Sequence, residues 1–347
     1  TVNLNVSLSE LSEGLSGSAS PKDFETLMQL INLRYTAARF DPEAHQAIIG
    51  RYLAFVENMN KNPQKILSDS LTRILSDYHP RVRIMDTDFI SDVELDQIEK
   101  IYTERFADAS DFRFYFVGNI QKEELVPLVE TYIASLSATN SKESWKDLNI
   151  DEPEGKVEKE IKLELSVPKS TVVLVFNQEM DYKPENMVLM RMIKGILDLR
   201  FTESIREEEG GTYGVSTNAS ISEFPDEKAS LLISFDTDPE KAMELKALVY
   251  AELEKLMNEG PSEEDLSKTA ENLLKEREEN KEHNSYWMSA LYNYYLQGYN
   301  LDDPKNYVDI VKSVKKKDVA KAMKKLYSGA NVVDVVFSPK DSETEGQ

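Results

Sequence analysis

An internal repeat constrains the fold of this chain more than any other feature of its sequence. A strand-like segment leads into a proline-initiated helix at Pro21, and the same order recurs at Pro239, a shift of 218 positions. Further along, an aromatic strand-like segment ends at Phe116 and its counterpart ends at Phe337, a shift of 221 positions. Because the register is kept over roughly a hundred residues, the repeat predicts two copies of one domain and not a solenoid.

The two copies differ at their start, because the first has no counterpart to residues 155–228. We therefore expect the chain to begin partway through its first domain. A polar segment with Asn140, Asp151 and Pro153 separates the copies, and such a composition is typical of a linker. The predicted organisation is a first domain over 1–138, a linker over 139–154, a second domain over 155–340 and a disordered tail over 341–347.

Hydrophobic periodicity sets the fold class. Apolar residues recur with helical spacing in nine segments, namely 23–38, 42–56, 63–75, 91–106, 123–136, 184–201, 239–258, 261–297 and 304–327. Strand-like patterns cover 1–8, 112–116, 161–165, 171–176, 213–221, 231–235 and 332–337. The prediction is an α+β fold of two homologous domains, each a mostly antiparallel sheet with helices packed on one face, the first copy being truncated at its N-terminus.

The charge balance excludes several classes of function. The formal net charge is −22, which disfavours nucleic acid and anionic membrane surfaces, since both bind through cationic side chains. No apolar run is long enough to cross a bilayer, so no membrane insertion is expected. The absence of cysteine excludes disulfides and thiolate chemistry but does not decide the compartment. An acidic surface would suit cationic peptides if it faced a cavity, although such surfaces most often serve solubility.

The segment 205–215 is where a predicted helix gives way to a strand. Gly210 and Gly211 can adopt positive φ and end the helix. Beyond them the apolar pattern changes to a period of two. In structural terms alone, Arg206 is a cation that stabilises the helix C-terminus, and Tyr213 is an ordinary strand residue.

The separation of Arg206 and Tyr213 across this Gly-rich helix end resembles the C-terminal half of the pitrilysin/insulinase (M16) family of zinc peptidases. The order of Arg39-Phe40-Asp41, Arg105-Phe106-Ala107-Asp108-Ala109, Phe116-Val117-Gly118-Asn119 and Leu125-Val126-Pro127-Leu128-Val129 resembles the third of that family's four homologous domains. The Arg206–Tyr213 element resembles the fourth.

The resemblance implies a catalytic role for both residues. Tyr213 would donate a hydrogen bond to the developing oxyanion of a peptide substrate, and Arg206 would bind a substrate carbonyl or position Tyr213. Zinc would be bound by an N-terminal half, in the same polypeptide or in a separate subunit. This chain would form the wall of a closed chamber around the peptide substrate.

The chain itself offers no zinc motif. The family's motif is an inverted His-x-x-Glu-His on one helix, whereas the only histidines are His45, His79 and His283, far apart in the sequence. We therefore predict no metal site and no peptidase activity in this chain alone. Three consecutive glutamates at 207–209 are interpreted as a solvated helix end. An aromatic group could line a peptide groove, although at helical spacing such residues more often serve core and interdomain packing: Tyr286, Trp287, Tyr292, Tyr294, Tyr295 and Tyr299.

Two functions follow from these features. The first is the non-metal half of a zinc-dependent endopeptidase. The alternative is a non-catalytic subunit that keeps the fold for binding or assembly, because a fold does not by itself establish a function. The presence of both Arg206 and Tyr213 favours the peptidase, since an assembly subunit would not need the pair.

Overall fold

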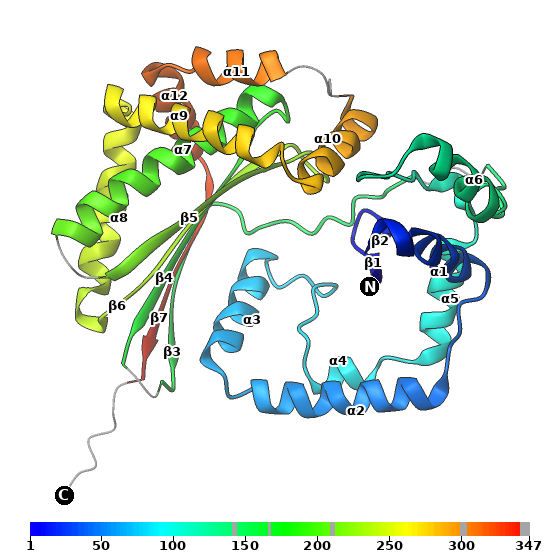
Figure 1. The fold of residues 1–347 in the computed structure, drawn as a ribbon. Coiled ribbons are helices and arrows are strands. Elements are labelled where there is room, and N and C mark those ends of the chain that lie inside the picture. The colour runs from blue at the N-terminus through cyan, green and yellow to red at the C-terminus, as the bar shows by residue number, and fades with distance from the viewer. Residues whose placement is uncertain (141–143, 166–167, 209–211, 299–303, 341–347) are drawn as a thin grey trace, which may run out of the picture. The chain divides into compact units, whose positions relative to one another are not determined.

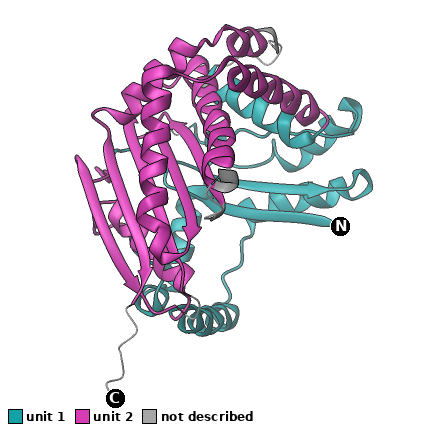
Figure 2. Cartoon of the chain, turned by 90° about the vertical axis from the view of Figure 1, so that its left-hand side faces the viewer, with its two compact units in different colours: residues 1–60, 83–148, 283–299 teal, residues 61–82, 149–282, 300–347 magenta. Residues whose placement is uncertain are grey.

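The computed structural model describes residues 1–140, 144–165, 168–208, 212–298 and 304–340. These residues form two compact units, which Figure 2 distinguishes by colour. Unit 1 comprises Thr1–Asn60, Arg83–Leu148 and His283–Tyr299, and unit 2 comprises Lys61–Val82, Asn149–Glu282 and Asn300–Gln347. The predicted disordered tail, 341–347, lies outside the described residues. Among the described helices, none is both long and apolar enough to cross a membrane.

Unit 2 is built on a five-stranded sheet with the order β3-β7-β4-β6-β5. Neighbouring strands are antiparallel except β3 and β7, which are parallel. The strands are β3 (Lys156–Leu163), β4 (Ser170–Glu179), β5 (Thr212–Ser222), β6 (Lys228–Thr237) and β7 (Asn331–Pro339). The continuous apolar segment of β4 lies in the centre of the sheet, because a strand buried on both faces needs apolar side chains on both. Edge strand β3 instead alternates exposed and half-buried residues.

Helices cover both faces of this sheet (Figure 1). One face packs against α7 (Pro184–Phe201), α8 (Ala242–Glu259) and α12 (Lys316–Tyr327) around Leu174, Ile196 and Leu253. Behind α7 lie α9 (Glu263–Asn280) and α11 (Pro304–Ser313), which contact Val188 and Met192. The other face packs against α3 (Pro63–Leu75), whose Ile74 is buried with Val173, Val335 and Phe337. The structure confirms the α+β class and adds a helix from the N-terminal part of the chain to the second face.

Unit 1 contains a two-stranded antiparallel sheet of β1 (Val2–Leu8) and β2 (Glu13–Ala19). Its helices are α1 (Phe24–Thr36), α2 (Pro42–Met59), α4 (Thr87–Ser91), α5 (Leu95–Phe106), α6 (Lys122–Tyr132) and α10 (Asn284–Gln297). The start of α2 illustrates why these boundaries form. Asp41 caps the helix by accepting hydrogen bonds from the backbone N–H groups of Glu43 and Ala44, and Pro42 occupies the first turn, where its missing N–H costs nothing.

The predicted strand at 112–116 is wrong, because these residues pair with no described strand. Their aromatic side chains still pack in the core of unit 1. The ring of Phe112 lies 5.2 Å from that of Tyr35, and Phe116 lies 6.0 Å from Phe24. The counterpart of this segment is β7, which is paired by β3 on one side and β4 on the other. Unit 1 has no described counterpart of either strand, so the segment lacks the neighbours that would make it a strand.

The repeat is visible in the order of the elements. The 3-10 turns at Pro21–Asp23 and Pro239–Lys241 precede α1 and α8, and the helices α2, α3, α4 and α5 correspond in order to α9, α10, α11 and α12. The counterparts α3 and α10 are exchanged between the units. Helix α3 comes from the first copy of the repeat but belongs to unit 2, and α10 comes from the second copy but belongs to unit 1. The two units therefore differ from the continuous ranges 1–138 and 155–340, whose behaviour as domains stays a prediction.

The exchange of α10 also divides a predicted helix. The periodicity of 261–297 predicts one continuous helix, but the structure ends α9 at Asn280 and begins α10 at Asn284. Most of the aromatic group lies on α10, and Trp287, Tyr292, Tyr294 and Tyr295 each expose more than two fifths of their surface. These four residues are therefore not part of a core, whereas interdomain packing and a peptide groove both stay predictions. Tyr299 lies outside the described residues.

The chain passes from unit 1 to unit 2 through an exposed segment. Its start is fixed by Asp108, whose side chain accepts hydrogen bonds from the hydroxyl and N–H groups of Ser110 and Thr139. These bonds hold the pKa of Asp108 far below its usual value. Residues 144–150 then form no helix or strand, and Trp145 and Leu148 are exposed.

We expect trypsin to cleave the native chain first after Lys146, because proteolysis selects exposed segments without secondary structure. Each fragment would carry one exchanged helix, so the two fragments should elute together in native gel filtration and separate only in denaturant. Mass spectrometry of a time course identifies the first cut. An initial cleavage inside β4 or β7 would contradict the assigned organisation of the chain.

Candidate functional site

The helix that leads to the predicted site, α7, is held firmly in unit 2. Its Gly195 lies against α9, where a Cβ atom would come within 2.6 Å of Thr269 Cγ2, so only glycine permits this close packing. Near its C-terminus, Arg200 donates a hydrogen bond of 3.0 Å to the carbonyl of Gly260. The guanidinium also lies 3.6 Å from Glu252 Oε2 and 3.8 Å from Asp265 Oδ2. The end of α7 is thereby tied to α8, to α9 and to the loop between them.

The chain does not leave the helix at Phe201 but continues as a π-helix, η3 (Thr202–Glu208). Ile205 within η3 is fully buried in the main core of unit 2. The hydroxyls of Thr202 and Ser204 donate to the carbonyls of Asp198 and Arg200, at 2.7 and 2.9 Å. Such bonds to the preceding turn accompany bent or widened helices. The backbone of Arg206 lies in this π-helix.

Strand β5 begins with a second irregularity. Thr212 pairs with Thr237 of β6 and Val215 pairs with Phe235. Strand β5 therefore has one more residue than β6 between these two pairs. This arrangement is a β-bulge, and Gly214 within it has a φ of +157°. The backbone of Tyr213 lies inside the bulge. Beyond it, Val215, Ala219 and Ile221 pack on the helix-covered core, as the alternating pattern predicts.

The side chains of Arg206 and Tyr213 lie outside the part of the chain whose side chains are described, and so do Gly210 and Gly211. The joint catalytic role of Arg206 and Tyr213 stays a prediction. What the structure adds is the backbone around them, with a π-helix before the glycines and a β-bulge after them. Both irregularities are frequent next to active sites, where they redirect side chains.

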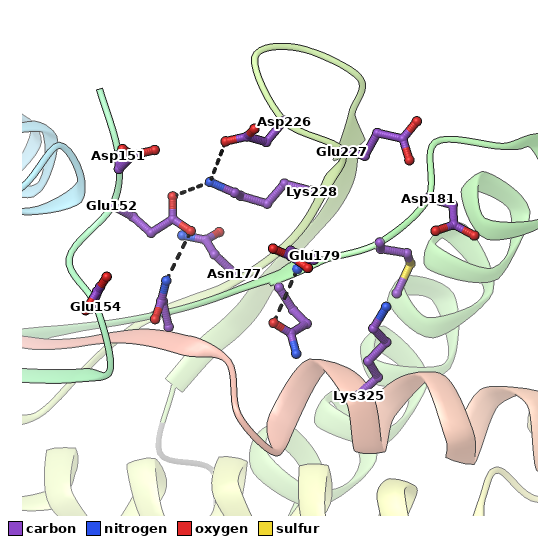
Figure 3. Close-up of a pocket in the computed structure, with 13 residues that line it drawn as sticks. Asp151, Glu152, Glu154, Asn177, Glu179, Asp181, Asp226, Glu227, Lys228 and Lys325 are labelled. Atoms are coloured by element: carbon purple, nitrogen blue, oxygen red, sulfur yellow. Dashed lines mark hydrogen bonds and ion pairs between the residues drawn. The ribbon is translucent and has the colours of Figure 1, made fainter. Parts of the chain in front are cut away.

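A separate hollow of about 540 Å³ lies at the end of the sheet where β4 ends and β6 begins (Figure 3). Two lysines, Lys228 and Lys325, line it together with Asn177, Gln178, Met180 and Asn331. The rest of the lining consists of seven carboxylates: Asp151, Glu152, Glu154, Glu179, Asp181, Asp226 and Glu227. The excess of carboxylates gives the hollow a negative potential, which attracts cations without selecting among them.

One ion pair anchors the loop beside this hollow. Lys228 Nζ lies 2.6 Å from Glu152 Oε2, and Asn331 donates to the other oxygen of Glu152 at 3.4 Å. Partial burial raises the pKa of Glu152, but the Lys228 ammonium and the Asn331 amide outweigh it and hold the pKa below its usual value. Glu152 therefore remains ionised at neutral pH and fixes the entry into β3.

No pattern in the amino-acid sequence predicts this hollow. Its lining comes from five places along the chain, namely the linker before β3, the end of β4 with the following loop, the turn into β6, α12 and the start of β7. The residues are mostly polar and lie at turns and element ends, a composition typical of loops. Their convergence depends on the pairing of β4 with β6 and β7, which no single stretch of sequence reveals.

The histidines do not form a metal site. His45 lies on α2, His79 lies in the loop after α3, and His283 directly precedes α10. Among the described residues, no three histidine, aspartate or glutamate side chains are arranged to hold a metal ion. The described residues therefore contain no set that fits a zinc ion, which the peptidase resemblance assigns to the other half.

We expect the purified chain to retain no stoichiometric zinc after dialysis and to leave a fluorogenic peptide uncleaved. The reason is the absence of a convergent ligand set in the described residues. Elemental analysis checks the first result and a fluorescence assay the second. One zinc ion per chain, removable only by a strong chelator, would contradict this prediction.

The sheet, its helices and the repeated element order define an M16-like metallopeptidase domain fold. The structure is similar to the periplasmic protease PqqL from Escherichia coli, with a TM-score of 0.80 and 20% identity, over 98% of this chain and 37% of that chain. It is also similar to a peptidase M16 inactive domain from Pseudomonas fluorescens, with a TM-score of 0.78 and 17% identity, over 98% of this chain and 81% of that one.

Sequence comparison identifies the family. The family model described as "Peptidase M16 inactive domain" matches residues 92–273, more than half of the chain, and the chain belongs to this family. The probable zinc protease PqqL of Haemophilus influenzae is 21% identical over 258 residues, which cover 74% of this chain and 27% of that protein. The chain thus spans less than a third of that relative's length. The predicted family is confirmed.

Proposed function

We propose that this chain is the non-metal half of a zinc-dependent endopeptidase and that it supplies the substrate-binding wall of a closed chamber. Its membership of the M16 inactive-domain family supports the proposal. The zinc ion would be bound by an N-terminal half, in the same polypeptide or in a separate subunit, and the substrate would be a peptide.

The observation that carries the proposal is the irregular backbone around Arg206 and Tyr213. A π-helix precedes this segment and a β-bulge follows it, and both irregularities are frequent at functional sites, which favours a role for the segment beyond packing. Tyr213 would donate a hydrogen bond to the oxyanion that develops on the scissile carbonyl. Arg206 would bind a substrate carbonyl or hold the tyrosine in place.

These donors act where negative charge develops in the transition state. A preorganised hydroxyl group aimed at the oxyanion lowers the barrier because it need not reorient during the reaction. The guanidinium contributes a fixed positive charge and a planar set of donors that suits carbonyl and carboxylate oxygens. Together they would stabilise the transition state more than the bound substrate, which is the condition for raising kcat.

The alternative function is a non-catalytic subunit for binding or assembly. Combining the chain with a zinc-bearing M16 half and a fluorogenic peptide distinguishes the two. Chelator-sensitive hydrolysis that requires this chain supports the peptidase. Stable association of the two halves without hydrolysis of any peptide in a mixed library would support the assembly subunit instead.

A further inference from the structure

The acidic hollow at the end of the sheet contains a buried amide without a partner. Asn177 lines the hollow from the end of β4 and is only 9% exposed (Figure 3). Its side-chain amide makes no hydrogen bond with any residue that the structure describes. Burial of an amide without a partner costs free energy, so the buried amides of native proteins nearly always have one. The wall of the hollow therefore offers hydrogen-bonding groups that the described chain does not use.

The neighbouring strand shows how such an amide is satisfied. Asn331 of β7 is the direct cross-strand partner of Asn177, so the two side chains lie on the same face of the sheet. Asn331 donates to Glu152 Oε1 at 3.4 Å, and its side-chain oxygen accepts from the N–H of Gly155 at 2.8 Å. Both ends of this amide are thus used to hold the linker against β7, whereas both ends of the Asn177 amide are left for a ligand.

The carboxylates of the hollow also exceed the cations beside them. Lysines are paired with three of the seven: Glu152, Asp181 and Asp226. The other four make no ion pair with any described residue: Asp151, Glu154, Glu179 and Glu227. The charge of Lys325 acts on Asp181, whose pKa is held below its usual value chiefly by Lys183 and to a smaller extent by Lys325. The four unpaired carboxylates therefore remain for a cationic ligand.

Two of these carboxylates belong to the same part of the sheet as Asn177. Glu179 follows Asn177 by two residues on β4, and alternate residues of a strand point to the same face. Glu227 is held at the end of β4, because its carbonyl accepts a hydrogen bond of 2.9 Å from the N–H of Met180. These side chains supply one amide oxygen and two carboxylates to the hollow.

The arrangement of the oxygens favours an organic cation over a metal ion. A calcium ion needs about six to eight oxygens at roughly 2.3–2.6 Å, whereas no three described carboxylates are placed to hold an ion. A guanidinium or alkylammonium group presents several N–H donors in different directions and so bridges oxygens that stand apart. The hollow, of about 540 Å³, has the size of a small-molecule site. Met180 in its wall offers an apolar contact to the methylene groups that carry such a cation.

We propose that this hollow binds a guanidinium or alkylammonium group, with the Asn177 carbonyl accepting a hydrogen bond and Glu179 and Glu227 supplying the negative charge. Two sources carry this chemistry, namely the arginine or lysine side chain of a peptide and a free polyamine. The hollow lies beside the turn between β5 and β6, whereas Tyr213 lies at the other end of β5. Binding at this hollow is therefore independent of the activity proposed for Tyr213.

Titration calorimetry measures the binding directly. The probes are a peptide with neutral ends and two arginines, the same peptide with citrulline in place of arginine, spermidine, and calcium chloride. About 0.15 M salt screens distant charges. One arginine peptide or one spermidine should bind per chain, and the tighter of the two identifies the source of the cation. The citrulline peptide should bind at least roughly tenfold more weakly than the arginine peptide, because it keeps the shape and the hydrogen-bond donors but loses the charge.

Variants locate the binding. Asn177→Leu keeps the size of the side chain and removes the amide, and the double variant Glu179→Gln, Glu227→Gln removes two charges. Each should weaken binding of the tighter ligand by roughly tenfold or more, the usual effect of losing a hydrogen bond to a charged group. The matched control is the double variant Glu57→Gln, Glu276→Gln, which removes two exposed charges from α2 and α9. It should change the affinity by less than about twofold.

Circular dichroism verifies that each variant is folded, and the double glutamine variant decides the matter if Asn177→Leu is not. Unchanged affinity in the folded hollow variants overturns the proposal, because the cation would then bind elsewhere. Equal binding of the citrulline peptide overturns it as well, and so does the absence of binding of both organic cations at millimolar concentration. Calcium that binds and displaces the organic cation would make the hollow a metal site instead.

Discussion

Replacing Tyr213 with phenylalanine is expected to lower kcat by about 100–1000-fold, or about 2.7–4 kcal/mol in the barrier. The substitution removes one hydroxyl and keeps the ring, so packing in β5 should be preserved. If the hydroxyl donates to the oxyanion only in the transition state, KM should change much less than kcat. The measurement is steady-state hydrolysis of a fluorogenic peptide, with the zinc-bearing half supplied in the same polypeptide or as a subunit.

Two further variants make this test specific. Arg206→Ala should cause a comparable loss, and the double variant should lose much less than the product of the two single effects if the residues act as a unit. The matched control is Tyr78→Phe, which removes an exposed hydroxyl of the same chemistry elsewhere in unit 2. Wild-type kcat in Tyr213→Phe, with hydrolysis still abolished by a chelator, would make Tyr213 an ordinary strand residue.

Replacing Asp334 with alanine is expected to destabilise unit 2 by about 3–5 kcal/mol, the usual cost of removing one partner of a buried ion pair. Asp334 lies on β7 with its side chain 1% exposed. It accepts hydrogen bonds from Lys246 Nζ at 3.0 Å and from the Tyr250 hydroxyl at 3.0 Å. The variant leaves the Lys246 ammonium largely buried without its carboxylate. Urea unfolding should show a lower midpoint at an unchanged slope.

A compensated variant separates the loss of the pair from the loss of packing. Replacing the whole cluster by Asp334→Met, Lys246→Met and Tyr250→Phe should restore most of the stability, because no buried charge remains. Glu164→Gln, which removes a carboxylate from a solvent-exposed ion pair with Lys340, should leave the midpoint unchanged. If Asp334→Ala and Glu164→Gln shifted the urea midpoint equally, the buried ion pair would contribute no more to stability than the exposed one.

The sequence was sufficient for the features that depend on local pattern. The continuous apolar run of β4 predicts a central strand, and the structure places it between β6 and β7. Proline-initiated helices at Pro42 and Pro184 begin where the sequence predicts. The alternation of Leu231, Ile233 and Phe235 matches their burial in the core. In each case the residues that decide the structure are neighbours along the chain.

The features that the sequence did not reveal depend on distant partners. Residues 112–116 have the alternation of a strand, but a strand also needs neighbours to pair with. No glycine or proline marks the break between α9 and α10 at 281–283. The π-helix at 202–208 and the bulge at 212–215 require the register of β5 on β6 to be known. Local propensity carries no information about these constraints, so the surroundings of the Arg206–Tyr213 segment could be described only from the structure.

The exchanged helices have a consequence for how the chain is made. Residues 283–299 belong to unit 1 but leave the ribosome after the whole of 149–282, while residues 61–82 of unit 2 emerge long before the strands on which α3 packs. At about 5–20 residues per second, unit 1 waits on the order of ten seconds for its last helix. During that interval the aromatic segment 112–116 lacks α10, whose Tyr295 carbonyl accepts a hydrogen bond from Arg113. Unit 1 thus stays incomplete until α10 has been translated, and unit 2 stays incomplete until β7, the last described strand, has followed.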